Sequence, residues 1–292
     1  MPFDNSWAGV SVSVIPITHA NWRARLYLRY GPRRGQTRLL QREQFGPLLV
    51  QRPFQAEAGV CHTYLLHPPG GVVGGDQLQI IIAADSGAHS LVTTPGAGKF
   101  YRSGGQYAAQ QLQLQVADGA LLEWLPQETL FFPGACARLE TRIELVTGAR
   151  FIGWEMLCFG RPVLKECFSH GDIRGRSQIY LDGELRLSEG LFLQQAGNPE
   201  QLAGLQTYPM QGNCYVFPAD AQLLALVRQA LTTFAAGTND FEYGATLVDG
   251  ILCIRLLGHQ TEVLMTALIA VWQQIHQHWH GRLPQPPRIW AT

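Results

Sequence analysis

Short runs of alternating apolar and polar residues fill the first 217 positions, and this alternation is typical of half-buried β-strands. In QLQLQV (111–116) each leucine or valine falls on one face and each glutamine on the other. Further runs lie at 24–30, 77–85, 86–94, 137–159 and 177–187. Glycine or Asp-Gly turns follow the runs, and the Asp-Gly pairs at 118–119, 182–183 and 249–250 are expected to close hairpins. We therefore expect a mainly β protein, built as a sandwich, a barrel or stacked β-layers.

After Phe217-Pro218 the apolar residues recur at helical spacing. The expected helices cover 220–237, with Asp220 and Gly237 as caps, and 262–280, with Thr261 and Gly281 as caps. A hairpin at 245–258 separates them, and the prolines of the tail LPQPPRIWAT keep it extended. The sequence thus predicts a β-rich body at 1–217 and a helix–hairpin–helix lobe with its tail at 218–292, packed together as one continuous domain.

Composition narrows the classes of partner. Charged residues make up 15% of the chain, and 22 basic side chains balance 22 acidic ones, so no one-signed field exists to attract nucleic acid or an anionic membrane. The longest apolar run, LMTALIAVW, is far shorter than the ~18 residues that span a bilayer. The start lacks the features of a signal peptide, and the six cysteines have no zinc-ligand spacing. We expect a cytoplasmic protein with reduced thiols.

Two glycine-dense stretches invite comparison with nucleotide-binding loops, namely LHPPGGVVGGD (66–76) and TTPGAGKFYRS (93–103). A phosphate loop needs a hydroxyl residue directly after its lysine and a helix that begins there, but Lys99 is followed by Phe100 and then by no helical pattern. The first stretch precedes a strand, whereas a dinucleotide fingerprint precedes a helix. The glycines are therefore expected to form tight turns and close backbone contacts.

Four motifs in this order carry a family resemblance: LHPPGGVVGGD, LVTTPGAGKFYRS, LEWLPQETLFFPGA and FIGWEMLCFGRP. Together they resemble the UreD (also called UreH) family of urease accessory proteins. The resemblance implies a fold of stacked β-layers similar to a β-helix. The chain departs from the family pattern at Pro133, where an acidic residue is common, and at Gly98, where a hydroxyl residue is common.

The resemblance also implies a role. The family is a nickel-delivery chaperone that binds apo-urease and the partners UreF and UreG, and UreG is the GTPase of that set. It is not known as an enzyme, so we expect no catalytic residues and no tightly bound cofactor, only nickel ions in transit. The low charge and the PQPPRIW tail further suggest apolar surface that a partner covers.

A protein that hands on nickel must hold the ion weakly, so dispersed acidic and polar groups along a wet passage are expected, with no closed cluster of four ligands. Asp76, Glu123, Glu128, Glu155 and Glu166 stand among strands where charge is scarce. The candidate passage residues are Asp76, Glu123, Glu128, Glu166 and His67. The same acids could instead form structural ion pairs with Lys99, Arg102, Arg161 or Lys165. Motif residues expected to shape the fold are Gly70, Gly71, Gly74, Gly75, Pro95, Gly96, Lys99, Arg102, Trp124, Gln127, Trp154 and Arg161.

HQHWH (276–280) is a further candidate for metal binding, because His276 and His280 share one face of the expected helix. A solvated helix end is the simpler interpretation, since two imidazoles make an incomplete site. Two other functions stay open. One is a purely structural scaffold of the activation complex with no metal role. The other is a β-rich hydrolase that uses Glu128 with His67 or Asp76, although no nucleophile elbow or catalytic triad supports it.

Overall fold

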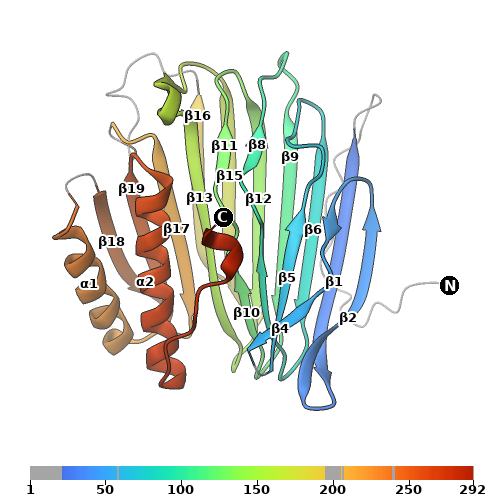
Figure 1. Ribbon diagram of the computed structural model, residues 1–292, viewed down its shortest axis with the longest axis vertical. Coiled ribbons are helices and arrows are strands. Elements are labelled where there is room, and N and C mark those ends of the chain that lie inside the picture. The colour runs from blue at the N-terminus through green and yellow to red at the C-terminus, as the bar shows by residue number, and fades with distance from the viewer. Residues whose placement is uncertain (1–21, 58, 195–204, 206, 239–240, 292) are drawn as a thin grey trace.

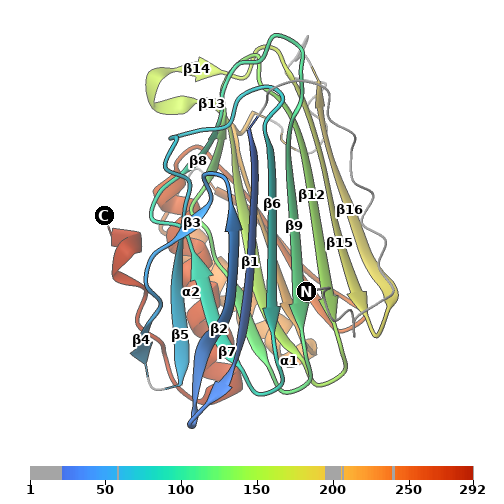
Figure 2. The same cartoon turned by 90° about the vertical axis from the view of Figure 1, so that its right-hand side faces the viewer.

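Two β-sheets packed face to face form the body of the protein. The computed structural model describes residues 22–291 except 58, 195–204, 206 and 239–240. The seven-stranded sheet contains, in spatial order, β16 (Glu184–Gln194), β15 (Asp172–Leu181), β12 (Cys136–Leu145), β9 (Ala108–Val116), β6 (Gln77–Ala84), β1 (Arg23–Arg33) and β2 (Gln36–Phe45). Figure 2 shows β6, β9, β12 and β15 of this sheet side by side.

The second sheet has twelve strands. Its main path is β18 (Phe241–Val248), β19 (Ile251–Gly258), β17 (Met210–Phe217), β13 (Arg150–Arg161), β10 (Leu121–Trp124), β7 (His89–Thr93), β5 (Val60–Leu66) and β3 (Leu49–Val50). Four short strands lie off this path: β4 (Phe54–Glu57), β8 (Gly98–Phe100), β11 (Thr129–Phe131) and β14 (Glu166–Cys167).

The central strands alternate between the two sheets as the chain advances. β6, β9 and β12 lie parallel in one sheet, while β7, β10 and β13 lie parallel in the other. The chain therefore winds like a β-solenoid, which confirms the expected stacked β-layers. No helix is needed between these parallel strands, because each return strand belongs to the opposite sheet.

One expected hairpin is wrong. Asp118-Gly119 joins β9 to β10, and these strands lie in different sheets. An Asp-Gly turn can connect two paired strands or two strands of opposite sheets. Only the strands with which β9 and β10 pair, which are far away in the sequence, distinguish the two cases. The hairpins at 182–183 and 249–250 are confirmed, since β15 pairs antiparallel with β16, and β18 with β19.

Two helices, α1 (Ala221–Ala235) and α2 (Thr261–His280), cover the outer face of the twelve-stranded sheet at its end with β17, β18 and β19 (Figure 1). Asp220 caps α1, because its carboxylate accepts a 2.8 Å hydrogen bond from Leu223 N. Gly281 ends α2 in the left-handed conformation, as expected. The other two expected caps, Gly237 and Thr261, are wrong. Ala236 is the C-cap of α1, and Gln260 is the N-cap of α2, so that Thr261 is already the first helical residue.

Among the described residues no helix combines the length and apolar character needed to cross a bilayer.

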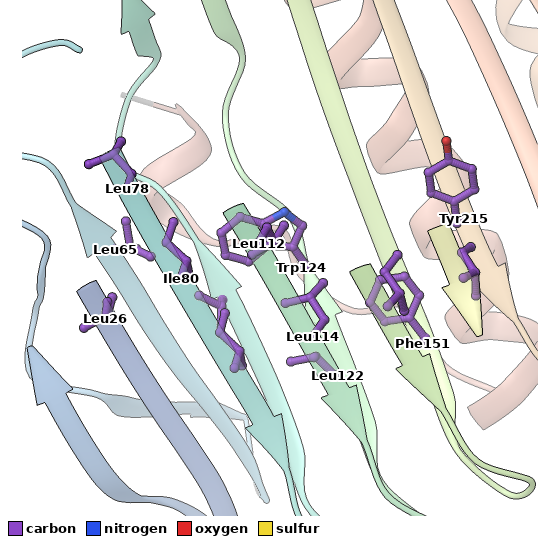
Figure 3. Close-up of a cluster of buried hydrophobic side chains, with 14 of the residues drawn as sticks. Leu26, Leu65, Leu78, Ile80, Leu112, Leu114, Leu122, Trp124, Phe151 and Tyr215 are labelled. Carbon is purple, nitrogen blue, oxygen red and sulfur yellow. The ribbon is translucent and has the colours of Figure 1, made fainter. Parts of the chain in front are cut away.

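The central strands of the twelve-stranded sheet, β10, β13 and β17, are buried on both faces. The inner face of this sheet packs against the seven-stranded sheet, where leucine and isoleucine side chains such as Leu112, Leu114 and Leu122 meet (Figure 3). Its outer face packs against α1 and α2 in a second apolar cluster that includes Trp154. Because side chains alternate along a strand, Trp154 of β13 faces the helices and the next residue, Glu155, faces the interior.

Candidate functional site

A cavity of about 480 Å³ lies between the two sheets. This volume is many times the ~10–15 Å³ that one water molecule requires. Apolar side chains of both sheets form most of its wall, among them Leu78, Ile80, Leu112 and Trp124. Turn residues of the motif regions complete the wall at 65–72 and 94–100.

The twelve-stranded sheet is interrupted beside this cavity. β7 ends at Thr93 and the chain resumes pairing at β8, while β10 ends at Trp124 and resumes at β11. β13 runs past both breaks, pairing first with β10 and then with β11. Two irregular segments, 94–97 and 125–128, therefore replace regular strand in the cavity wall.

The glycine-dense motifs form part of this wall and hold no phosphate loop. Gly70, Gly71, Gly96 and Gly98 line the cavity, and Lys99 belongs to strand β8. Gly71 also leaves room for a neighbour, because a methyl group there would lie 2.2 Å from the Tyr101 ring. The glycines thus act as the turns and close contacts that the sequence predicts.

A smaller pocket of about 40 Å³ adjoins the cavity. The two share the lining residues Leu139, Thr141, Glu155 and Leu157. The cavity and this pocket, with the wall residues that they share, are together called the interior passage. The glycine-rich turns line the cavity, and Glu189 of β16 and Tyr215 of β17 line the smaller pocket.

Glu155 and Glu189 are the acidic groups of the smaller pocket. Glu155 Oε1 accepts a 3.3 Å hydrogen bond from Asn213 Nδ2, and Glu189 Oε2 accepts a 2.9 Å bond from the Tyr215 hydroxyl. Arg255 also forms an ion pair with Glu189. Burial raises the pKa of Glu155; the Asn213 hydrogen bond opposes this shift and the charge of Glu189 adds to it.

The five candidate passage residues lie in different places, and of them only His67 is part of the cavity lining. Burial lowers the pKa of His67, while Asp76 raises it. Asp76 itself closes a turn, accepting hydrogen bonds from Val73 N (3.0 Å) and Trp22 N (3.3 Å). Glu166 forms an ion pair with Arg161, which agrees with the alternative that these acids form structural ion pairs.

Glu128 lies next to the cavity wall, near Lys99 and near Glu262 on α2. Burial raises the pKa of Glu128, with a smaller contribution from the negative charge of Glu262. Among the other motif residues, Trp124, Gln127 and Pro95 line the cavity, whereas Trp154 faces the helices.

Glu123 belongs to a buried polar cluster on the opposite face of the sheet, under α2. Its carboxylate is 1% exposed and lies 2.5 Å from His89 Nε2, 3.0 Å from His276 Nε2 and 2.5 Å from Trp272 Nε1. An ionised carboxylate only accepts hydrogen bonds, so all three neighbours donate. Burial alone would raise the pKa of Glu123, but the hydrogen bonds from His276 and His89 outweigh it and hold the pKa well below its usual range.

The HQHWH motif therefore has a structural role at its first histidine. His276 is 3% exposed and bound to Glu123, so the solvated helix end expected there is wrong for this residue. His276 and His280 do share a face, with ring centroids 5.3 Å apart. Within the described chain, no group of three or more histidine, cysteine, aspartate and glutamate side chains is arranged to hold a metal ion.

His280 is expected to reduce stability in acid. Its pKa is lowered to about 4 by burial and by the nearby positive charges of His276 and Arg150. The unfolded chain, with a histidine pKa of about 6.5, takes up this proton first as pH falls, so the free energy of unfolding drops between about pH 6.5 and pH 4. Urea unfolding across this range should show a shallower slope for His280→Gln. His278→Gln is the control for removing a histidine from the same helix end, and an unchanged slope in His280→Gln would contradict the expectation.

Comparison with known proteins agrees with the resemblance of the motifs. Residues 23–291 match the sequence model of the family described as UreD urease accessory protein. The urease accessory protein UreD of Escherichia coli is 51% identical over 274 residues, which cover 94% of this chain and 98% of that protein. That of Vibrio parahaemolyticus is 50% identical, covering 94% and 97%. That of Klebsiella aerogenes is 42% identical over 279 residues, covering 96% and 100%. The chain therefore belongs to the UreD family of urease accessory proteins.

Proposed function

We propose that this protein delivers nickel to apo-urease and that Ni²⁺ moves through the interior passage on its way. In this proposal the protein works in a complex with UreF, which holds the GTPase UreG, and bridges that pair to apo-urease. The observation that supports the proposal is that the cavity behind the motif turns shares four wall residues with a pocket lined by two carboxylates.

The chemistry of the lining suits an ion in transit. Ni²⁺ accepts carboxylate, imidazole and water as ligands, and the passage offers Glu155, Glu189 and His67 at separate points. No closed set of four protein ligands is available along it to trap the ion, within the residues that the structure describes. Hydration by water in the cavity would complete the coordination at each step.

Glu155 is the residue on which the proposal depends most, because it borders both the cavity and the smaller pocket. Its pKa is raised, and a carboxyl group must lose its proton before it binds a metal ion. A proton therefore competes with Ni²⁺ for Glu155 more strongly than for an exposed glutamate. An ion leaving the cavity toward Glu189 would pass this side chain.

Glu155→Gln tests the proposal, since glutamine keeps the size and removes the charge. We expect urease activity and the nickel content of urease, measured in cells that carry all accessory proteins, to fall about tenfold or more, the scale on which losing a polar group beside a bound metal ion lowers affinity or activity. The matched control is Glu242→Gln, an exposed glutamate on strand β18 of the same sheet. Co-purification with UreF, UreG and urease should be unchanged. Full nickel content in the Glu155→Gln cells would favour the scaffold without a metal role.

A further inference from the structure

The C-terminal residues lie on the outer face of the twelve-stranded sheet, beside α2 (Figure 1). The last described residues form a short helical turn, Arg288–Ala291, and the ring centroid of Trp290 lies 5.4 Å from that of Trp154 and 5.6 Å from that of Trp272. Gln273 Nε2 of α2 donates to Pro284 O at 3.1 Å. The expectation that the tail is extended apolar surface for a partner is therefore wrong for Trp290, which is partly buried against the protein's own body.

Trp290 is hydrogen-bonded to Thr93, the last residue of β7, where the sheet is interrupted. Its Nε1 donates to Thr93 Oγ1 at 2.9 Å, and the Thr93 hydroxyl donates in turn to Leu125 O at 2.6 Å. Trp154 Nε1 donates to Pro126 O at 2.8 Å. These carbonyls follow directly after β10, where sheet pairing stops, so side chains supply the partners that a continuous strand would have supplied.

The next residues of both segments form the cavity wall. Thr94 and Gln127 line the cavity and are joined to each other, since Gln127 N donates to Thr94 Oγ1 at 2.9 Å. Gly98 N donates to Glu128 O at 2.8 Å. Glycines at 96 and 98 leave segment 94–98 with much backbone freedom. A contact that fixes Thr93 therefore restrains the start of this wall.

We propose that Trp290 is a positioning residue for the cavity wall: from the outer face of the sheet it holds segments 94–97 and 125–128 in the arrangement that the interior passage requires. This inference rests on the proposed nickel route. The competing explanation for the position of Trp290 is simple packing of its indole ring against Trp154 and Trp272. The two explanations differ in the group of Trp290 that they require. Packing needs the ring, whereas positioning needs the hydrogen bond to Thr93.

The test uses the full chain in its complex with UreF and compares Trp290→Phe, Thr93→Val and Thr93→Ser. Trp279→Phe is the control for shortening a tryptophan on the same face of the sheet, because the ring contacts of Trp279 are with His280 and Arg150. Amide hydrogen exchange should accelerate about five- to tenfold at 94–98 and 125–129 in Trp290→Phe and Thr93→Val, the size expected for one lost hydrogen bond. Thr93→Ser should keep its protection. Urease activation should fall several-fold in the two variants that lose the bond.

Unchanged exchange at these two segments in Trp290→Phe would overturn the positioning role. So would equal acceleration in β6, β9 and β12, since that result reports general destabilisation. Normal urease activation by Trp290→Phe, with activation lost in Glu155→Gln, would also overturn it while leaving the nickel route standing. A last outcome would be normal urease activation with Glu155→Gln, together with faster amide exchange only at the two wall segments in Trp290→Phe. The nickel route would then fail, and the restraint of the wall by Trp290 would still be supported.

Discussion

Replacing Glu123 with alanine is expected to lower the free energy of unfolding by about 3–5 kcal/mol, because each buried donor left without an acceptor costs about 1–3 kcal/mol. The substitution leaves three donors without an acceptor, on His89, His276 and Trp272. Two of these, on His276 and Trp272, belong to residues at most 3% exposed, so water cannot replace the carboxylate easily. These contacts also join α2 to β10, so the packing of the helix on the sheet should weaken with them.

Urea unfolding of three variants separates the contributions to this effect. Glu123→Gln keeps an acceptor for Trp272 and removes the charge, so its loss should be smaller, about 1–2 kcal/mol. The control is Glu184→Ala, which breaks an exposed pair with Arg186 and should cost less than about 1 kcal/mol. Equal unfolding free energies for Glu123→Ala and Glu184→Ala would show that the cluster contributes little to stability.

The sequence predicts the elements well because their signals are local. Alternation along QLQLQV places the inward and outward faces of β9 correctly, and the apolar spacing of 262–280 matches α2. The sheet in which each strand lies is not local. Asp118-Gly119 is compatible with a hairpin and with a corner, and only the pairing of β9 with β12 and of β10 with β13 decides between them.

The candidate site was predicted less well, for two physical reasons. Glu155 stands in FIGWEMLCF, a run that is apolar at nearly every position because β13 is buried on both faces, so alternation does not reveal which side chains face the cavity. Glu123 and His276 are 153 positions apart, and their contact depends on how α2 crosses the sheet. One signal was available: His276 falls on the apolar face of its helix, with Trp272 and Ile275, and a histidine there needs a buried partner.

Gly171→Ala is the second substitution for which we expect a large loss of stability, because Gly171 is crowded on two sides. Its φ of +142° lies in a region that other residues rarely adopt, which costs about 1–3 kcal/mol. A methyl group would lie 2.4 Å from the Phe168 ring and 2.5 Å from Ala135 O, and such overpacking adds about 1–3 kcal/mol.

Neither neighbour of Gly171 can move without further cost. Phe168 is 6% exposed, and Ala135 O accepts the 3.0 Å hydrogen bond from Asp172 N where β15 begins beside β12. The free energy of unfolding in urea should therefore fall by about 2–6 kcal/mol in Gly171→Ala. Gly104→Ala is the matched control, since nothing lies within 4 Å of its added methyl group, and it should change stability by less than about 0.5 kcal/mol. Equal stability of the two variants would mean that the crowding at Gly171 is relieved by small backbone shifts.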